Sequence, residues 1–235
     1  MATDPENDEY ASPPCLMHEL APSTDERQWA DVRRWRKAER ERLLGLRRSV
    51  EPENKDRFAE AIGRELDRMI GNVSDRIISG YWPIKAEPNL MPWMEGLEAR
   101  GAVCCLPVVV EPNTSLVFKQ WQRGMKMIPG IWNIPTPADS PTVVPDVVLA
   151  PVLGFDEACY RLGNGGGYFD RTLAVLQPRP LVIGVGYERL KIRTIYPQPH
   201  DVPMDVIVTE RSAVSRPAAT GHPTPPRAAP PSGRF

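Results

Sequence analysis

The sequence predicts an α/β fold, in which a single domain forms a three-layer α/β/α sandwich around a mostly parallel sheet. Two observations predict it. Segments with helical periodicity alternate along the chain with short apolar segments of strand length. Several of these strands, such as VVLAPV and LVIGVG, contain no polar or charged side chain. This is typical of strands that are buried on both faces of a sheet.

The expected elements follow one another in a regular order. In residues 51–72 apolar side chains recur at helical spacing, and Pro52 and Gly71 suit the first turn and the C-terminal cap. Residues 25–50 repeat apolar side chains near the same spacing, at Trp29, Val32, Trp35, Leu43 and Leu46. Strands are expected within residues 76–83, 102–110, 115–122, 146–156, 180–188 and 204–210, and two more helices within residues 89–101 and 168–176.

The composition limits the class of protein. The chain has 235 residues, a formal net charge of -1, 41% hydrophobic residues and 25% charged residues, which is typical of a soluble globular protein. The first residues are acidic and lack the apolar segment of a signal peptide, so we expect a cytoplasmic protein. We expect a monomer whose partners are small molecules, with no nucleic acid and no membrane.

The two ends of the chain differ in composition from its middle. Residues 1–24 are rich in proline and acids, and residues 212–235 are rich in proline. We therefore expect a disordered leader and a disordered tail around a domain of residues 25–211. The four cysteines form no CxxC pair, which excludes a typical zinc site and favours free thiols. Cys104 and Cys105 are expected to be small buried strand residues.

The stretch RLGNGGGYFDR, residues 161–171, lies between an expected strand and an expected helix. Glycines without side chains let backbone N–H groups converge on an anion, and the helix that follows adds its positive end. Arg161 and Arg171 flank the loop and could contact a phosphate, and Asp170 could hold magnesium. The stretch lacks the GK[ST] ending of a P-loop. These residues alone leave a phosphate site and a tight structural turn equally open.

A wider pattern resembles the 5-formyltetrahydrofolate cyclo-ligase family. FDEACYRLGNGGGYFDR, residues 155–171, looks like the signature of that family. RKAER, YWPIKAE, IWNIPTP and PHDVPMDVIVTE resemble further landmarks of the family and occur in the right order. The resemblance covers roughly residues 28–210.

The resemblance implies an enzyme with ATP and Mg²⁺ as cofactors. Such an enzyme closes a ring in 5-formyltetrahydrofolate to give 5,10-methenyltetrahydrofolate, and it releases ADP and phosphate. Phosphorylation of the formyl oxygen makes that oxygen a good leaving group, and the resulting iminium phosphate is attacked by a folate nitrogen. The protein mainly positions the reacting groups and neutralises charge.

The resemblance also assigns roles to individual residues. For ATP it implies Arg36, Lys37 and Arg40 of the first helix, together with Arg161, Leu162, Gly163, Asn164, Gly165, Gly166, Gly167, Tyr168 and Phe169. The implied catalytic residues are Tyr168 and Arg161. The implied folate contacts are Trp82, Glu87, Trp132 and Tyr168, and the implied magnesium ligands are Asp170 and Asp201.

Other interpretations stay open on the sequence. A folate- or nucleotide-binding protein with little turnover, or an ATP-dependent enzyme that acts on another formyl or amide compound, would share these features. The helix arginines could form a solvated charged face, although Arg36 and Arg40 share one side of the helix. Asp170 and Asp201 could be a first-turn acid and a turn acid, and Trp132 could be a core aromatic.

Overall fold

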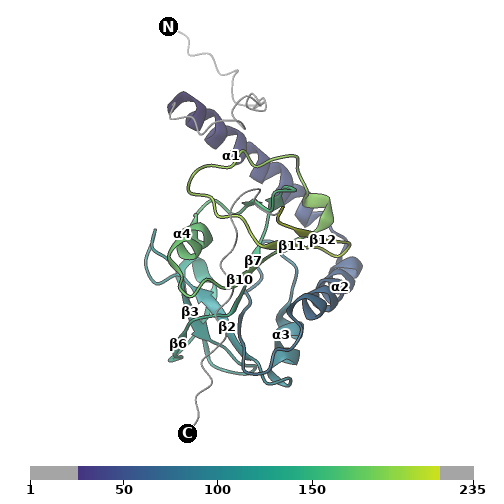
Figure 1. Cartoon of the computed structure of the whole chain (residues 1–235), viewed down its shortest axis with the longest axis vertical. Coiled ribbons are helices and arrows are strands. Elements are labelled where there is room, and N and C mark those ends of the chain that lie inside the picture. Colours follow the sequence, from purple (N-terminus) through teal and green to yellow (C-terminus); the bar gives the residue numbers. More distant parts are fainter. Residues whose placement is uncertain (1–25, 218–235) are drawn as a thin grey trace.

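The computed structural model describes residues 26–217, with side chains from residue 28 onward (Figure 1). The helices are α1 (Glu26–Arg48), α2 (Pro52–Ile70), α3 (Met91–Glu98) and α4 (Tyr168–Val175), with the short 3₁₀ helices η2 (Ile131–Asn133) and η3 (Glu188–Leu190). Within the described residues, no helix combines the length and apolar character needed to cross a membrane. The expected leader, residues 1–24, lies outside the described range.

A sheet of eight strands, in the order β12-β11-β10-β7-β1-β2-β3-β6, forms the middle of the fold. Its parallel centre consists of β11 (Val206–Val208), β10 (Leu181–Val185), β7 (Val147–Pro151), β1 (Ile77–Ser79) and β2 (Val103–Val108). Its antiparallel edges are β12 (Ala213–Ser215), β3 (Val117–Gln120) and β6 (Thr142–Val143). Two small hairpins pair β4 (Met127–Pro129) with β5 (Pro135–Pro137), and β8 (Gly154–Phe155) with β9 (Arg161–Leu162).

Helices cover both faces of this sheet, as the alternation of side chains along β7 makes clear. Val147 and Leu149 belong to a core cluster with residues of α2 and α3. Val148 and Ala150 belong to a second cluster, to which α4 contributes Leu173. Figure 1 shows the same arrangement, with α4 on one side of the strands and α2 and α3 on the other. The predicted α/β/α sandwich with a mostly parallel sheet is confirmed.

The order of the strands creates one switch point in the sheet. From β1 the chain continues to β2 on one side, and it later places β7 on the opposite side of β1. The segments that leave the carboxyl ends of β1 and β7 therefore diverge, and ligands of open α/β sheets bind where this happens. The segment after β1 carries Glu87, and the segment after β7 leads through β8 and β9 into the glycine stretch.

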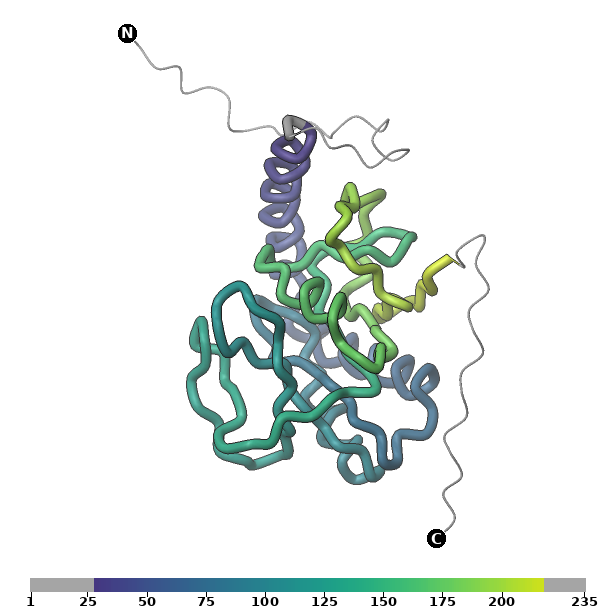
Figure 2. Tube along the Cα trace, turned by 60° about the vertical axis from the view of Figure 1, so that its left-hand side comes forward, coloured from purple at the N-terminus to yellow at the C-terminus, as the bar shows by residue number. Residues whose placement is uncertain are grey.

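Helix α1 packs over this end of the sheet. Its Leu43 lies in a third core cluster with Leu153, Leu162, Leu190 and Ile195, which follow the carboxyl ends of β7 and β10. In Figure 2 the first turns of α1 project beyond the rest of the coloured chain, and its later turns lie against these segments. The helix is thereby placed beside the loops that were expected to bind ligands.

Most expected elements are present, and one boundary is wrong. Pro52 begins α2, and the N–H of Gly71 caps that helix by donating to the Asp67 carbonyl oxygen at 3.0 Å. Cys104 and Cys105 are buried in β2, and with Cys159 they are free thiols, as expected. The expected tail, however, began at residue 212, whereas Ala213–Ser215 pairs with β11. A strand of three residues at a sheet edge is too short to produce a periodic signal. Residues 218–235 lie outside the described range.

Candidate active site around the glycine stretch

The glycine stretch leaves β9 and runs directly into α4. Gly165 and Gly167 have φ angles of 103° and 65°, which side chains other than glycine rarely adopt. A Cβ atom at Gly163 would collide with the Arg161 guanidinium, and a Cβ atom at Gly166 would lie 2.7 Å from the Tyr168 ring. The stretch therefore needs glycine both for its backbone path and for the side chains packed against it.

Four consecutive backbone N–H groups in the glycine-rich part of the stretch are unused. Among residues 26–217, those of Asn164, Gly165, Gly166 and Gly167 donate no hydrogen bond, and Asn164, Gly165 and Gly166 are exposed. Unpaired N–H groups at the beginning of a helix form an anion-binding site together with the positive end of the helix dipole. The predicted phosphate-binding loop has the backbone that this function requires.

Arginines hold the carbonyl groups of the stretch. Arg40 Nε donates to the Gly163 carbonyl oxygen at 2.9 Å, and Arg171 Nη2 donates to the Gly166 carbonyl oxygen at 2.6 Å. The Arg171 guanidinium also lies over the Tyr168 ring, 4.9 Å from its centroid. Burial and the nearby Arg36 lower the pKa of Arg40. Three positive charges, those of Arg40, Arg161 and Arg171, therefore surround an exposed loop.

Arg161 and Asp170 form a largely buried ion pair that joins the two ends of the stretch. Arg161 Nη2 donates to Asp170 Oδ2 at 2.8 Å, and the guanidinium covers the Phe169 ring at 5.2 Å from its centroid. The other oxygen of Asp170 accepts the Val202 backbone N–H at 3.2 Å. Asp170 thus joins the beginning of α4 to the segment that carries the second predicted magnesium ligand, Asp201.

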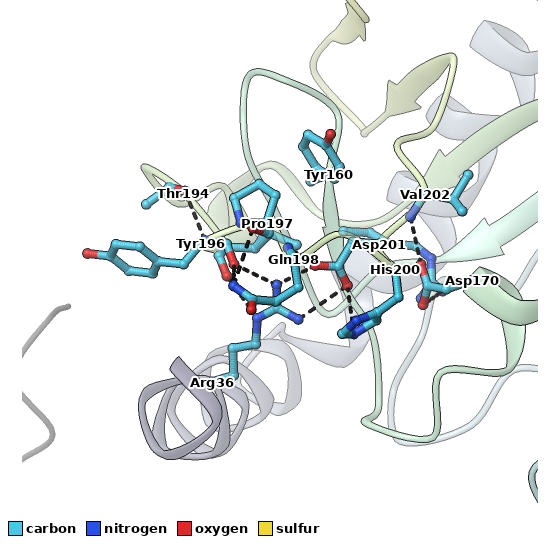
Figure 3. A network of polar contacts seen from close by, with 12 residues as sticks. Arg36, Tyr160, Asp170, Thr194, Tyr196, Pro197, Gln198, His200, Asp201 and Val202 are labelled. Carbon is cyan, nitrogen blue, oxygen red and sulfur yellow. Dashed lines mark hydrogen bonds and ion pairs between the residues drawn. The ribbon is translucent and has the colours of Figure 1, made fainter. Parts of the chain in front are cut away.

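Asp201 is bound to Arg36, as Figure 3 shows. Arg36 Nη2 and Nη1 donate to the two carboxylate oxygens of Asp201 at 2.5 Å and 3.2 Å. The same guanidinium donates to the carbonyl oxygens of Ile195 and Tyr196, at 2.9 Å and 2.8 Å, and the Gln198 N–H donates to Asp201 at 2.6 Å. Arg36 is buried and is not part of a solvated face; in this structure its guanidinium fastens the segment of residues 195–201 to α1.

The two predicted metal ligands lie in one neighbourhood but hold arginines there. Asp170 pairs with Arg161, and Asp201 pairs with Arg36. No group of three or more His, Cys, Asp or Glu side chains within the described residues is arranged to hold a metal ion. Magnesium bound together with a nucleotide needs only one or two protein carboxylates, because phosphate oxygens and water complete its shell. The donor set therefore fits a magnesium–nucleotide complex and does not form an all-protein metal site.

Glu87 follows β1 and is buried. Its Oε2 accepts the Ile84 N–H at 3.0 Å, and its Oε1 accepts Asn164 Nδ2 at 3.2 Å and lies 3.5 Å from Arg47 Nη1. Burial raises the pKa of Glu87, although these contacts and the Lys85 charge oppose the rise. The side chain of Asn164, expected at a phosphate, is instead directed to the carboxylate expected at the folate. The two predicted subsites are thereby in direct contact.

The remaining predicted residues differ in their surroundings. Trp132 is 63% exposed, with a φ of 56°, so it is not a core aromatic. Its ring meets the Tyr168 ring edge-on, with centroids 5.3 Å apart, and Tyr168 Oη accepts the Asn113 N–H at 3.3 Å. Trp82 is half-buried against the first core cluster. Lys37 is exposed on α1, and no contact in the structure links it to the glycine stretch.

One residue of this site was missed on the sequence, namely Arg47. Its side chain has 0% exposure and contacts the segment that carries Glu87. Arg36, Arg40 and Arg47 lie within an arc of about 40° on α1, because eleven residues make about three turns. Each donates to the carbonyl oxygen of a different segment, at Ile195, Gly163 and Lys85. The positions of these three arginines on one side of the helix were a signal in the sequence. It was not recognised because α1 contains many other arginines.

Comparisons with known proteins identify the family of the chain. The model of the 5-formyltetrahydrofolate cyclo-ligase family matches residues 32–210. A relative named 5-formyltetrahydrofolate cyclo-ligase from Mycolicibacterium smegmatis is 29% identical over 184 residues, which cover 73% of this chain and 92% of the relative. A relative of the same name from Escherichia coli K12 is 25% identical over 170 residues, which cover 69% and 93%.

Solved structures show the same likeness. The NMR structure of 5,10-methenyltetrahydrofolate synthetase from Aquifex aeolicus has a TM-score of 0.67 at 26% identity, covering 81% of this chain and 96% of that one. The structure of a 5,10-methenyltetrahydrofolate synthetase from Mycoplasma pneumoniae has a TM-score of 0.61 at 25% identity, covering 74% and 98%. The chain belongs to the 5-formyltetrahydrofolate cyclo-ligase family and is a ligase.

Proposed function

We propose that this protein converts 5-formyltetrahydrofolate to 5,10-methenyltetrahydrofolate, with ATP and Mg²⁺, and releases ADP and phosphate. The match to the family model over residues 32–210 supports this activity, as do the names of the relatives and of the solved structures. We expect the protein to act as a cytoplasmic monomer on these small molecules alone.

The observation that carries the proposal is the contact between Asn164 and Glu87. Asn164 lies in a loop with unused N–H groups, and its Nδ2 is 3.2 Å from the Glu87 carboxylate. The loop predicted to bind phosphate and a buried carboxylate are therefore adjacent at the switch point of the sheet. A reaction that transfers a phosphoryl group from ATP to a folate requires its two substrates to lie next to each other.

The chemistry begins at the formyl oxygen. This oxygen attacks the γ-phosphorus of ATP, and the bond from that phosphorus to the bridging oxygen of ADP breaks. The folate nitrogen N10 then attacks the formyl carbon, which is bonded to N5. N10 loses its proton, and the bond from the formyl carbon to the phosphate oxygen breaks. The protein stabilises the charge that moves onto the phosphate oxygens. The N–H groups of residues 164–167, together with Arg40 and Arg161, are positioned for that task.

Glu87 and Tyr168 are assigned to the folate. A carboxylate accepts two hydrogen bonds from an adjacent ring N–H and amino group, which the folate pterin offers side by side. Tyr168 lies at the end of the phosphate loop with its ring against Trp132, so these two aromatic residues would contact the part of the folate nearest the phosphate. Trp82 lies with Glu87 in the segment after β1, and it would contact the folate from that segment.

Magnesium would be held by Asp170 and Asp201. Their carboxylate oxygens are the hard donors that Mg²⁺ prefers, and the phosphates of ATP would supply further oxygens. When bound, the ion neutralises part of the phosphate charge. Asp170 and Asp201 each pair with an arginine, so the same residues also hold Arg161 at the glycine stretch and Arg36 against the segment of residues 195–201.

The test is a direct assay. The protein is mixed with 5-formyltetrahydrofolate, ATP and Mg²⁺, and the absorbance of the methenyl product is followed together with ADP release. We expect both products in equal amounts, and neither in the absence of ATP or Mg²⁺. Tight binding of folate and ATP without product would favour a binding protein with little turnover. ATP-dependent turnover of another formyl compound alone would favour a different substrate.

A further inference from the structure

Arg47 is a fully buried cation next to the predicted folate carboxylate. It lies in the last turn of α1, its side chain has 0% exposure, and its Nη1 is 3.5 Å from Glu87 Oε1. Its Nε donates to the Lys85 carbonyl oxygen at 2.9 Å. A single side chain therefore contacts both the carboxylate of Glu87 and the backbone that leads to it.

The turn that Arg47 holds has an unfavourable backbone. Lys85 and Ala86 have φ angles of 48° and 61°, and two consecutive residues of this kind persist only where surrounding contacts impose them. Glu87 closes the turn by donating its N–H to the Ile84 carbonyl oxygen at 2.9 Å and accepting the Ile84 N–H on its carboxylate. The contact from Arg47 to Lys85 fastens this turn to α1 from outside.

The stability of the protein does not account for Arg47. Burial lowers its pKa, which reflects the cost of removing the cation from water. Among the described residues its buried Nη2 atom has no hydrogen-bond partner, and the contact with Glu87 is long. A hydrophobic side chain of similar size would fill the same space at lower cost. A buried cation with an unused donor is expected at a functional site rather than in a purely structural core.

We propose that Arg47 is a positioning residue of the folate site, which fixes the turn of residues 83–87 and orients the Glu87 carboxylate toward the pterin. This inference rests on the proposed function. Within the described residues the polar contacts of Arg47 go to Lys85 and Glu87 and none goes to the glycine stretch, so we expect its effect to be confined to the folate side of the reaction.

Electrostatics reinforces the geometric role. The charged and titratable groups that act on Glu87 are Arg47 from α1, Lys85 from its own turn, and the tyrosines Tyr81 and Tyr187. Asn164 adds a neutral hydrogen bond. The two tyrosines are buried, with pKa values above their ordinary range, so they stay neutral. The hydrogen bond from the Ile84 N–H and, after it, the charge of Arg47 oppose the rise in the Glu87 pKa that burial causes. Removal of Arg47 should therefore make Glu87 protonate at higher pH.

The experiment compares Arg47→Met with Arg48→Met. Arg48 is the neighbouring exposed residue of α1 and serves as the matched control. Affinities for 5-formyltetrahydrofolate and for ATP are measured separately by calorimetry, and folate affinity is followed from about pH 5, just above the ordinary pKa of a glutamate, to about pH 8. For Arg47→Met we expect folate affinity to fall about tenfold or more, ATP affinity to stay unchanged, and the folate profile to move to higher pH. Arg48→Met should match the wild type.

Arg47→Lys separates charge from geometry and covers the case in which Arg47→Met does not fold. Lysine keeps the charge but cannot hold Lys85 and Glu87 with one planar group. We expect it to restore the pH profile and to recover only part of the folate affinity. Unchanged folate affinity in either folded variant, or an equal loss of ATP affinity, would overturn the proposal. If the wild type itself does not bind 5-formyltetrahydrofolate, the proposed function fails instead.

Discussion

Arg36 and Asp201 form a bidentate ion pair across 165 positions of sequence, with their nearest atoms 2.5 Å apart. Both side chains are at least nine-tenths buried. Because Arg36 belongs to α1 and Asp201 lies between η3 and β11, the pair, which Figure 3 draws, sets the position of a loop relative to the helix. Its loss should affect stability as well as nucleotide binding.

Arg36→Met is therefore expected to destabilise the protein and to reduce activity. Removal of one partner of a buried pair leaves the other charge unpaired, at a cost of about 3 kcal/mol, and the carbonyl groups of Ile195 and Tyr196 also lose their donor. Thermal unfolding and the steady-state assay measure the two effects. Arg33→Met is the control, because Arg33 is an exposed residue of the same helix and should change neither. An Arg36 variant as stable as the control would contradict the tethering role.

Asp170→Asn should reduce turnover by at least about a hundredfold while the protein stays folded. Asparagine keeps an oxygen that can accept the Val202 N–H, but it removes the charge that pairs with Arg161 and that would bind magnesium. The kcat and its dependence on magnesium concentration provide the measurement. Wild-type kcat with unchanged magnesium dependence would remove Asp170 from the set of ligands.

Folate binding should weaken as the pH falls, and the onset should lie above the pH at which an ordinary glutamate protonates. Burial raises the pKa of Glu87 above 4.5, and the neutral carboxyl has lost the charge that makes it a good acceptor. Titration of folate affinity against pH in the wild type and in Glu87→Gln tests this. The variant should bind folate more weakly and should lack the component of the pH dependence that Glu87 causes. Identical profiles would exclude Glu87 from the folate site.

Gly165→Ala should weaken ATP binding about fivefold or more, even though its Cβ atom would have room. That atom would lie 3.7 Å from the Arg40 guanidinium, which is ordinary contact, so the cost comes from the φ angle of 103°. The matched control is Gly45→Ala in α1, where a Cβ atom meets nothing within 4 Å. That change should stabilise the helix by about 0.5–1 kcal/mol. If calorimetry gives both variants the ATP affinity of the wild type, the glycine stretch does not bind ATP through the backbone path described here.

Truncation tests the revised end of the domain. A chain that stops at residue 211 loses β12, so the edge of β11 that Ala213–Ser215 covers becomes free. We expect its melting temperature to lie several degrees below that of a chain ending at Pro217, which retains every strand of the sheet. Equal melting temperatures in the two truncated chains would show that β12 adds nothing to stability.

The sequence was most informative where a pattern is local. Helix α2 begins at Pro52 and is capped by Gly71, as expected, and the apolar segments form the central strands. Both signals depend only on residues that are neighbours in the sequence. The prediction that the glycine stretch belongs to a binding site came from the family resemblance, because the glycines alone are also compatible with a structural turn. The resemblance assigned Arg36 to ATP and Asp201 to magnesium, and in the structure the two side chains form an ion pair with each other.

Contacts between distant segments were not predictable in the same way. The direction of the Asn164 side chain depends on where the segment after β1 comes to lie, and no spacing within the stretch encodes that. Arg47 resembled the other arginines of α1 until its burial was known. The strand β12 was missed because its three residues are stabilised by pairing with β11 rather than by a pattern of their own.

The row of arginines on α1 has a consequence for how this protein can change. Arg36, Arg40 and Arg47 each fasten a different loop, so the loops of the predicted nucleotide and folate sites are all positioned by the same helix. An insertion of one residue between Arg40 and Arg47 would rotate the second half of the helix by about 100°. Surface loops generally tolerate the gain or loss of single residues, but a change in the length of this helix would displace the loops of both predicted substrate sites together.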